Sequence, residues 1–194
     1  MLAYLDGKFV YKSPAVVHVD VNGVGYEVQI SLNTFSKIQH LEKGILQTYL
    51  LIREDAHILY GFFDKSEKEL FINLISVSGI GATTARMMLS YMKPDEITRL
   101  IVHGDTHGLE KIKGIGKKTA ERVVLELKDK LAKQPLEINI SAMKSNTLHS
   151  DALNALMALG IARNTADQAI QRVTQSDPSL TSLEDVIKKA LKTL

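Results

Sequence analysis

The amino-acid sequence predicts a mixed β and α protein of several domains, with a strand-rich N-terminal part, a helical middle part and a small helical bundle at the end. Three observations predict this order. All eleven aromatic residues lie between Tyr4 and Tyr91. β-Branched and aromatic residues dominate the first 62 positions, whereas Ala, Leu and Lys dominate the rest. A twelve-residue pattern in the middle of the chain occurs twice.

The composition excludes several classes of protein. The 194 residues contain no cysteine, which rules out a disulfide scaffold, a thiolate zinc site and a cysteine nucleophile, and fits a reducing compartment. The 6 histidines lack the spacing of metal ligands. No apolar run approaches the ~20 residues of a membrane span, and an acid and a glycine come too early for a signal peptide. We therefore expect a cytoplasmic protein without a membrane segment, metal or other cofactor.

The charges are unevenly distributed, although the net charge of +2 gives no reason to expect a nucleic-acid partner. Residues 1–62 carry a net charge of −1, residues 63–134 carry +3, and residues 135–194 are neutral. Between His107 and Lys133 the chain has eight basic and four acidic residues. The excess of positive charge is therefore confined to the middle part.

The strand-rich part, residues 1–63, is predicted to contain two hairpins. In Ala15–Ile30, apolar and polar residues alternate on both sides of Asn22-Gly23. Alternation is typical of a strand with one buried face, and Asn-Gly favours a type I′ turn because both central residues need positive φ. A second hairpin is expected from Ile45–Ile52 and Ala56–Phe62, with Arg53-Glu54-Asp55 at its tip.

The opening segment Leu2–Tyr11 supplies a fifth strand, and Asn33–Ile38 is expected to form a short helix. Five short strands favour a small closed barrel of the oligonucleotide-binding (OB) type over an open sheet, whose edges would be exposed. Many such barrels bind nucleic acid and many do not, so the barrel alone does not decide the function.

The middle part, residues 64–134, contains the repeat. Leu74–Ala85 has the pattern Leu-x-x-Val-x-Gly-Ile-Gly-x-x-Thr-Ala, and Leu109–Ala120 repeats it 35 residues later with Ile in place of Val. Helical patterns flank each copy: Glu67–Val77 and Thr83–Met92 the first, Thr106–Ile112 and Lys117–Leu131 the second. This pattern is the helix-hairpin-helix motif in tandem.

The glycines of the motif point to phosphate binding. Gly79, Gly81, Gly114 and Gly116 are expected to permit tight turns with positive φ and to expose backbone N–H groups where the second helix of each copy begins. Such a helix N-terminus binds a phosphate oxygen regardless of base sequence. Polar side chains that follow the turns are expected to add contacts; they are Thr83, Thr84, Lys117, Lys118, Thr119 and Arg122.

The last part of the chain is predicted to be a tethered helical module. Pro135 ends the preceding helix, and residues 135–149 are Asn/Ser-rich and expected to form a flexible linker. Residues 150–194 are expected to form a three-helix (UBA-like) bundle whose first helix is capped by Ser150 and ended by Gly160. A module of this kind is typical of partner docking, although a bundle packed firmly on the rest of the chain is the alternative.

Residues along nearly the whole chain resemble the RuvA family; they are Gly23–Val28, Arg53–Ala56, Leu59–Phe62, Gly114–Arg122 and Ala158–Gly160. The resemblance implies a non-catalytic subunit that binds four-way (Holliday) junction DNA by its structure and holds it open. It also implies recruitment of the RuvB ATPase for branch migration in DNA recombination and repair. A homotetramer or two stacked tetramers are implied, with the RuvC resolvase as a further candidate partner.

The same resemblance assigns roles to two further groups of residues. Glu54 and Asp55 become an acidic pin at the tetramer centre, where four copies would place about eight negative charges near the junction crossover and repel phosphates. Without the resemblance, two acids at a hairpin tip are explained by solvent exposure alone. The ATPase contact is placed on four apolar residues of the last module; they are Leu156, Leu159, Ile161 and Leu191.

The sequence differs from the family pattern at two of these positions. Ile161 stands where the family commonly has an aromatic residue, and Thr83 stands where it often has a lysine. The first hairpin is therefore expected to depend more on backbone N–H groups than the second.

Two other functions remain open. A helix-hairpin-helix DNA repair enzyme of the glycosylase type needs an acid, usually with a lysine, downstream of the hairpin, and Asp129 and Lys130 are available. An RNA-binding barrel protein is the other alternative.

Overall fold

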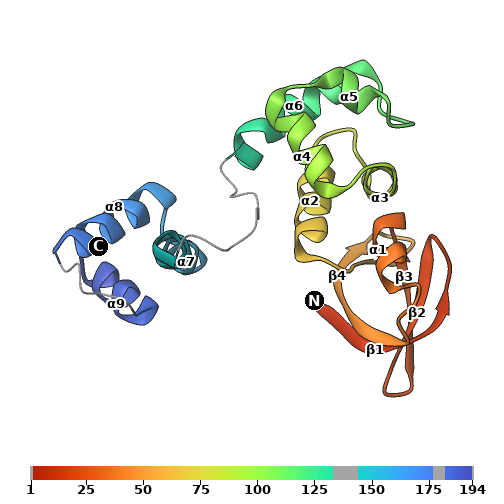
Figure 1. Ribbon diagram of the computed structural model, residues 1–194, viewed down its shortest axis with the longest axis horizontal. Helices are drawn as coiled ribbons and strands as arrows, with labels where there is room; N and C mark the ends of the chain where they lie inside the picture. Colours follow the sequence, from red (N-terminus) through yellow and green to blue (C-terminus); the bar gives the residue numbers. More distant parts are fainter. Residues whose placement is uncertain (1, 133–143, 177–181, 194) are drawn as a thin grey trace. The chain divides into compact units, whose positions relative to one another are not determined.

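The computed structural model describes residues 2–132, 144–176 and 182–193. The chain divides into two compact units, residues 1–136 and residues 137–194. The first contains the strands and the repeated motif, and the second contains the last helices (Figure 1). Within the described residues, no helix is both long and apolar enough to cross a membrane.

The strands of the first unit close into a barrel, as predicted. They are β1 (Tyr4–Lys12), β2 (Val16–Val21), β3 (Val24–Ile30), β4 (Lys43–Ile52) and β5 (His57–Phe62), and the helix α1 (Leu32–Ile38) joins β3 to β4. The order around the barrel is β1-β2-β3-β5-β4. Inward-facing residues fill the barrel; Val17, Val19, Val28 and Leu46 are fully buried. Because these apolar residues alternate with polar ones along the chain, each of their strands has one buried face.

Both predicted hairpins are confirmed. Asn22 and Gly23 have φ of 51° and 89° between the paired residues Val21 and Val24, as a type I′ turn requires. The Asp20 carboxylate accepts a hydrogen bond from the Gly23 N–H at 2.7 Å. In the second hairpin the Arg53 N–H donates to the Ala56 carbonyl at 2.8 Å, which places Glu54 and Asp55 at the exposed tip.

The repeated motif lies on helices α2 (Lys65–Ile75), α3 (Ala82–Tyr91), α5 (Thr106–Glu110) and α6 (Lys117–Ala132). A further helix, α4 (Pro94–His103), stands between the two copies and was not predicted. Its signals are present: proline in the first turn, Asp95 and Glu96 beside it, and Gly104 in the left-handed conformation at the end. Ile97 and Ile101 are fully buried, so α4 belongs to the core between the copies.

The barrel and the helices of the first unit share a hydrophobic core. The ring of Phe71 on α2 lies 5.0 Å from that of Tyr60 and 4.9 Å from that of Phe62, both on β5, measured between centroids. Because β5 leads directly into α2, the same aromatic cluster fixes the barrel against the first helix of the repeat.

A buried polar cluster also joins α1 to α2. The carboxylate of Glu67 on α2 accepts hydrogen bonds from the Ser31 hydroxyl and, at 2.7 Å, from the Thr34 hydroxyl of α1. Thr34 also accepts from the Phe63 N–H at 3.0 Å. Burial raises the pKa of the Glu67 carboxyl, and the two hydroxyl donors partly oppose that shift.

The second unit consists, in its described residues, of α7 (Lys144–Ala158), α8 (Arg163–Ser176) and α9 (Leu183–Thr193) around a small apolar core. The expectation that Ser150 caps the first helix is wrong, because α7 begins at Lys144. Leu148 packs against the core and the His149 imidazole lies 3.4 Å from the Asp167 carboxylate, so tertiary contacts extend the helix through a polar stretch. Residues 135–143 of the expected linker lie outside the described residues.

Candidate nucleic-acid interface

The two copies of the motif form the same turn. Gly79 and Gly114 have φ of 94° and 91°, in the left-handed region that favours glycine. The following isoleucine N–H donates in both copies to the carbonyl three residues earlier, at 3.0 Å. One turn later the alanines Ala85 and Ala120 donate to the carbonyls of Gly81 and Gly116, at 2.9 Å in both copies. The two copies of the sequence repeat therefore share the same turn and the same backbone hydrogen bonds.

The second glycine of each turn differs from the prediction. Gly81 has φ of −84° and ψ of 166°, and Gly116 is not among the described glycines with positive φ, so neither needs glycine for its backbone. A Cβ atom built on either residue would meet nothing within 4 Å. Neither the backbone conformation nor the packing requires glycine at these two positions. A ligand that approaches the backbone closely would require it, because any side chain would stand in its way. Gly81 is also the N-cap of α3 and offers no side-chain oxygen, which leaves the first N–H groups of that helix to an external acceptor.

The side chains predicted to bind phosphate surround these turns. Thr83, Lys117 and Lys118 are exposed, and Thr84 and Thr119 are half-buried at equivalent positions. With an offset of 35 residues, Lys117 and Lys118 correspond to Ala82 and Thr83. The second turn is therefore flanked by two lysines that the first turn lacks.

Arg122 has a contact that sequence reasoning missed. Its Nη1 donates to the carbonyl of Ser78, in the first turn, at 3.2 Å. The equivalent residue of the first copy is Met87, whose Cε lies 3.2 Å from the position of a Cβ on Gly114, in the second turn. Each copy thus reaches across to the turn of the other. The two turns are held together by a pseudo-symmetric pair of contacts, one polar and one apolar.

The expected partner-binding residues of the second unit divide into two groups. Leu156 is fully buried, so it belongs to the core of the bundle and is corrected as a direct partner contact. Ile161 is half-buried and packs against the same core. Leu159 and Leu191 are 64% and 43% exposed and remain on the surface. Met157, on the same helix as Leu156, is 40% exposed.

The glycosylase alternative rests on two residues of α6. Asp129 and Lys130 both lie exposed on α6. No group of three or more His, Asp or Glu side chains in the described ranges could hold a metal ion.

Comparison with known proteins gives one consistent answer along the chain. The family model of the RuvA N terminal domain matches residues 1–61, a SAM-like helix-hairpin-helix tandem matches residues 71–129, and the RuvA C-terminal domain matches residues 147–194.

Relatives match over their whole length. The chain is 46% identical to a protein of Flavobacterium psychrophilum and 45% identical to one of Christiangramia forsetii, each alignment covering 100% of both chains. It is 43% identical to a protein of Cytophaga hutchinsonii, with 99% of both chains covered. All three relatives are named Holliday junction branch migration complex subunit RuvA. These matches overturn the glycosylase alternative, and they show that the chain belongs to the RuvA family.

Proposed function

We propose that this chain binds four-way junction DNA through its phosphates and acts as a non-catalytic subunit that brings a RuvB ATPase to the junction. The names of its relatives support both the DNA substrate and membership of a branch migration complex. Recombination and repair of DNA in the cytoplasm is the setting this function implies.

The observation that carries the proposal is the pair of identical turns with open glycines. Gly81 and Gly116 leave free space where a phosphate oxygen would meet the N-termini of α3 and α6. The contacts are to backbone, so they select DNA by the spacing of its phosphates and not by its bases. The proposed DNA-binding residues are Gly79, Gly81, Thr83, Thr84, Gly114, Gly116, Lys117, Lys118 and Thr119, with Arg122 holding the turns together.

The acidic hairpin tip supplies the selectivity for a junction. Glu54 and Asp55 are exposed at the end of a hairpin, and carboxylates repel the phosphates of a continuous duplex. Four chains around one junction would bring these acids to the crossover, so the proposed assembly is a homotetramer or two stacked tetramers. The RuvC resolvase is a further candidate partner.

The second unit is the proposed docking module for the ATPase. Leu159, Leu191 and Met157 are exposed apolar residues of this unit, and they are the proposed contacts with the ATPase. The proposed domains are the barrel at 1–63, the tandem motif at 64–134, a linker that begins at 135, and a docking module that begins with α7 at Lys144 and not at the predicted residue 150.

A gel-shift titration tests the proposal. A four-way junction and a linear duplex of equal length are titrated with the full chain at the same salt concentration. The junction is expected to bind more tightly and to remain chemically unchanged. Equal affinity for both DNAs, or cleavage of either, would contradict the proposed function.

A further inference from the structure

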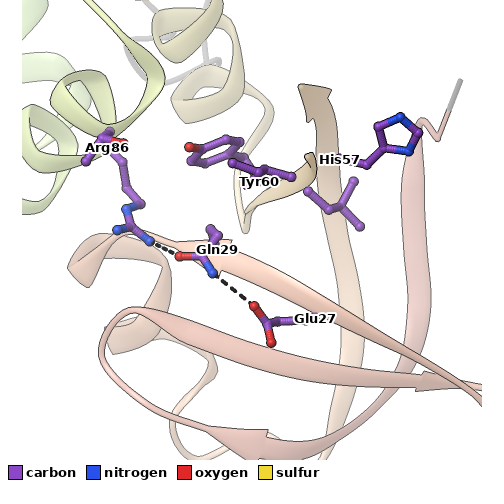
Figure 2. Close-up of a pocket in the computed structure, with 8 residues that line it drawn as sticks. Glu27, Gln29, His57, Tyr60 and Arg86 are labelled. Atoms are coloured by element: carbon purple, nitrogen blue, oxygen red, sulfur yellow. Dashed lines mark hydrogen bonds between the residues drawn. The ribbon is translucent and has the colours of Figure 1, made fainter. Parts of the chain in front are cut away.

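A pocket of about 440 Å³ opens between the barrel and helix α3. Figure 2 shows Arg86 reaching from its helix toward Gln29, which points in turn to Glu27, while His57 lies at the opposite end from Arg86. The volume is within the range of small-ligand sites, about 300–1,000 Å³. Its lining residues come from β3, β5 and α3; they are Glu27, Gln29, His57, Ile58, Leu59, Tyr60, Thr83 and Arg86.

The pocket exists because two barrel strands separate. β3 and β5 are paired only at Gln29 with Tyr60 and Ile30 with Gly61. Before that point Glu27 pairs with His18 of β2, and His57 pairs with Ile52 of β4, so each strand turns its other edge toward the pocket. An open strand edge offers backbone donors and acceptors to a ligand.

The polar groups of the pocket form a directed chain. The Arg86 guanidinium donates from Nη1 to the Gln29 side-chain oxygen and, at 3.2 Å, to the Ala15 carbonyl. The Gln29 amide donates to the Glu27 carboxylate at 3.3 Å. Within the described residues, Arg86 donates both hydrogen bonds from Nη1, so its Nε and Nη2 donors are available to an anion at that end of the pocket. The Glu27 carboxylate supplies an acceptor near the middle of the pocket.

The pocket lies between the acidic hairpin tip and the first of the proposed phosphate-binding turns. His57, the first residue of β5, follows the acidic tip residue Asp55 by two positions. Thr83 follows the open glycine Gly81 by two positions, in the first turn of α3. A strand that passes from the tip to the first phosphate-binding turn would therefore run over the pocket.

We propose that this pocket holds one unpaired nucleotide of the junction crossover. The Arg86 guanidinium and the Thr83 hydroxyl bind its phosphate, and the base stacks against the His57 imidazole. An exocyclic amino group donates to the Glu27 carboxylate, which favours cytosine over thymine. The site rests on the proposed function, since the acidic tip is what parts the strands. It replaces the pairing and stacking that the parted base loses, and so stabilises the open crossover.

Binding of short single strands to the full chain tests the pocket. Labelled octamers of deoxycytidine and of thymidine are titrated by fluorescence anisotropy against the wild type, Glu27→Ala and Glu42→Ala. Both substitutions remove one exposed negative charge of the barrel, and only Glu27 lines the pocket. The wild type and Glu42→Ala are expected to prefer deoxycytidine by about tenfold, and Glu27→Ala to lose that preference.

The outcomes separate this inference from the proposed function. His57→Ala should weaken both octamers about tenfold and weaken the junction as well, while the junction stays preferred over linear duplex, because the hairpin turns still hold the phosphates. Equal affinity of the wild type for the two octamers, or an unchanged preference in Glu27→Ala, would overturn the pocket alone. Loss of selectivity for the junction over duplex in the wild type would overturn the proposed function instead.

Discussion

Replacing Gly81 by alanine tests whether this glycine is required for DNA binding and not for stability. Gly79→Ala is the matched control. The two residues stand in the same turn, and at either position a Cβ atom would meet nothing within 4 Å. They differ in backbone conformation: φ is 94° at Gly79 and −84° at Gly81. The two alanine variants therefore differ in strain and not in packing.

The expected stabilities follow from that difference. Alanine at position 79 is held in the left-handed region, which costs about 1–2 kcal/mol. Alanine at position 81 lowers the entropy of the unfolded chain, a gain of about 0.4–1 kcal/mol. It is also a poorer N-cap than glycine, a loss of about 0.5–1 kcal/mol. The unfolding free energy of Gly81→Ala is thus expected to stay near that of the wild type.

The affinity of Gly81→Ala for the junction is expected to fall, although its stability stays near that of the wild type. Its methyl group would occupy the space in front of the first N–H groups of α3, so a phosphate loses hydrogen bonds to a charged acceptor worth about 1.5–3 kcal/mol. Junction binding should weaken about ten- to a hundredfold. Urea unfolding gives the stabilities and gel shift the affinities. A Gly81→Ala protein that binds the junction like the wild type would refute phosphate binding at this helix.

Three further predictions concern charge. Lys117→Ala with Lys118→Ala should reduce the slope of log affinity against log salt by about one to two units per protomer engaged, and an unchanged slope would remove both lysines from the phosphate contacts. Glu54→Ala with Asp55→Ala should keep or strengthen binding while relaxing junction selectivity, whereas loss of all binding by a folded variant would contradict the pin. Because the pKa of Glu67 is raised in the folded state, this group binds its proton more tightly when folded, and its contribution to stability falls as pH rises above the ordinary carboxyl value of about 4.5. Urea unfolding of Glu67→Gln across that range should lose this part of the pH dependence; a difference from wild type that does not vary with pH would contradict it.

Local patterns predicted the barrel hairpins and the repeat well, because both depend on a few residues with strong backbone preferences. Asn22-Gly23 needs only its own positive φ values, and the pattern around Gly79 recurs bond for bond around Gly114. The turns of the repeat were therefore predicted in position, although only the first glycine of each turn is required by the backbone.

Features that depend on tertiary contacts were not predictable in the same way. The start of α7 at Lys144 is stabilised by the packing of Leu148, and the burial of Leu156 depends on which helix face meets α8 and α9. The contact of Arg122 with Ser78 joins residues 44 positions apart. The pocket arises where β3 and β5 separate, which no run of residues encodes locally. The helix α4 is different, since its proline, acids and final glycine were signals present in the sequence.

Competition between DNA structures tests the central claim most directly. A complex of the full chain with a labelled four-way junction is challenged with an excess of unlabelled linear duplex that carries the same arm sequences. The two turns and the acidic tip predict that the junction stays bound at duplex concentrations far above those of unlabelled junction that displace it. Displacement by duplex and by junction at the same concentration would contradict recognition of the four-way structure.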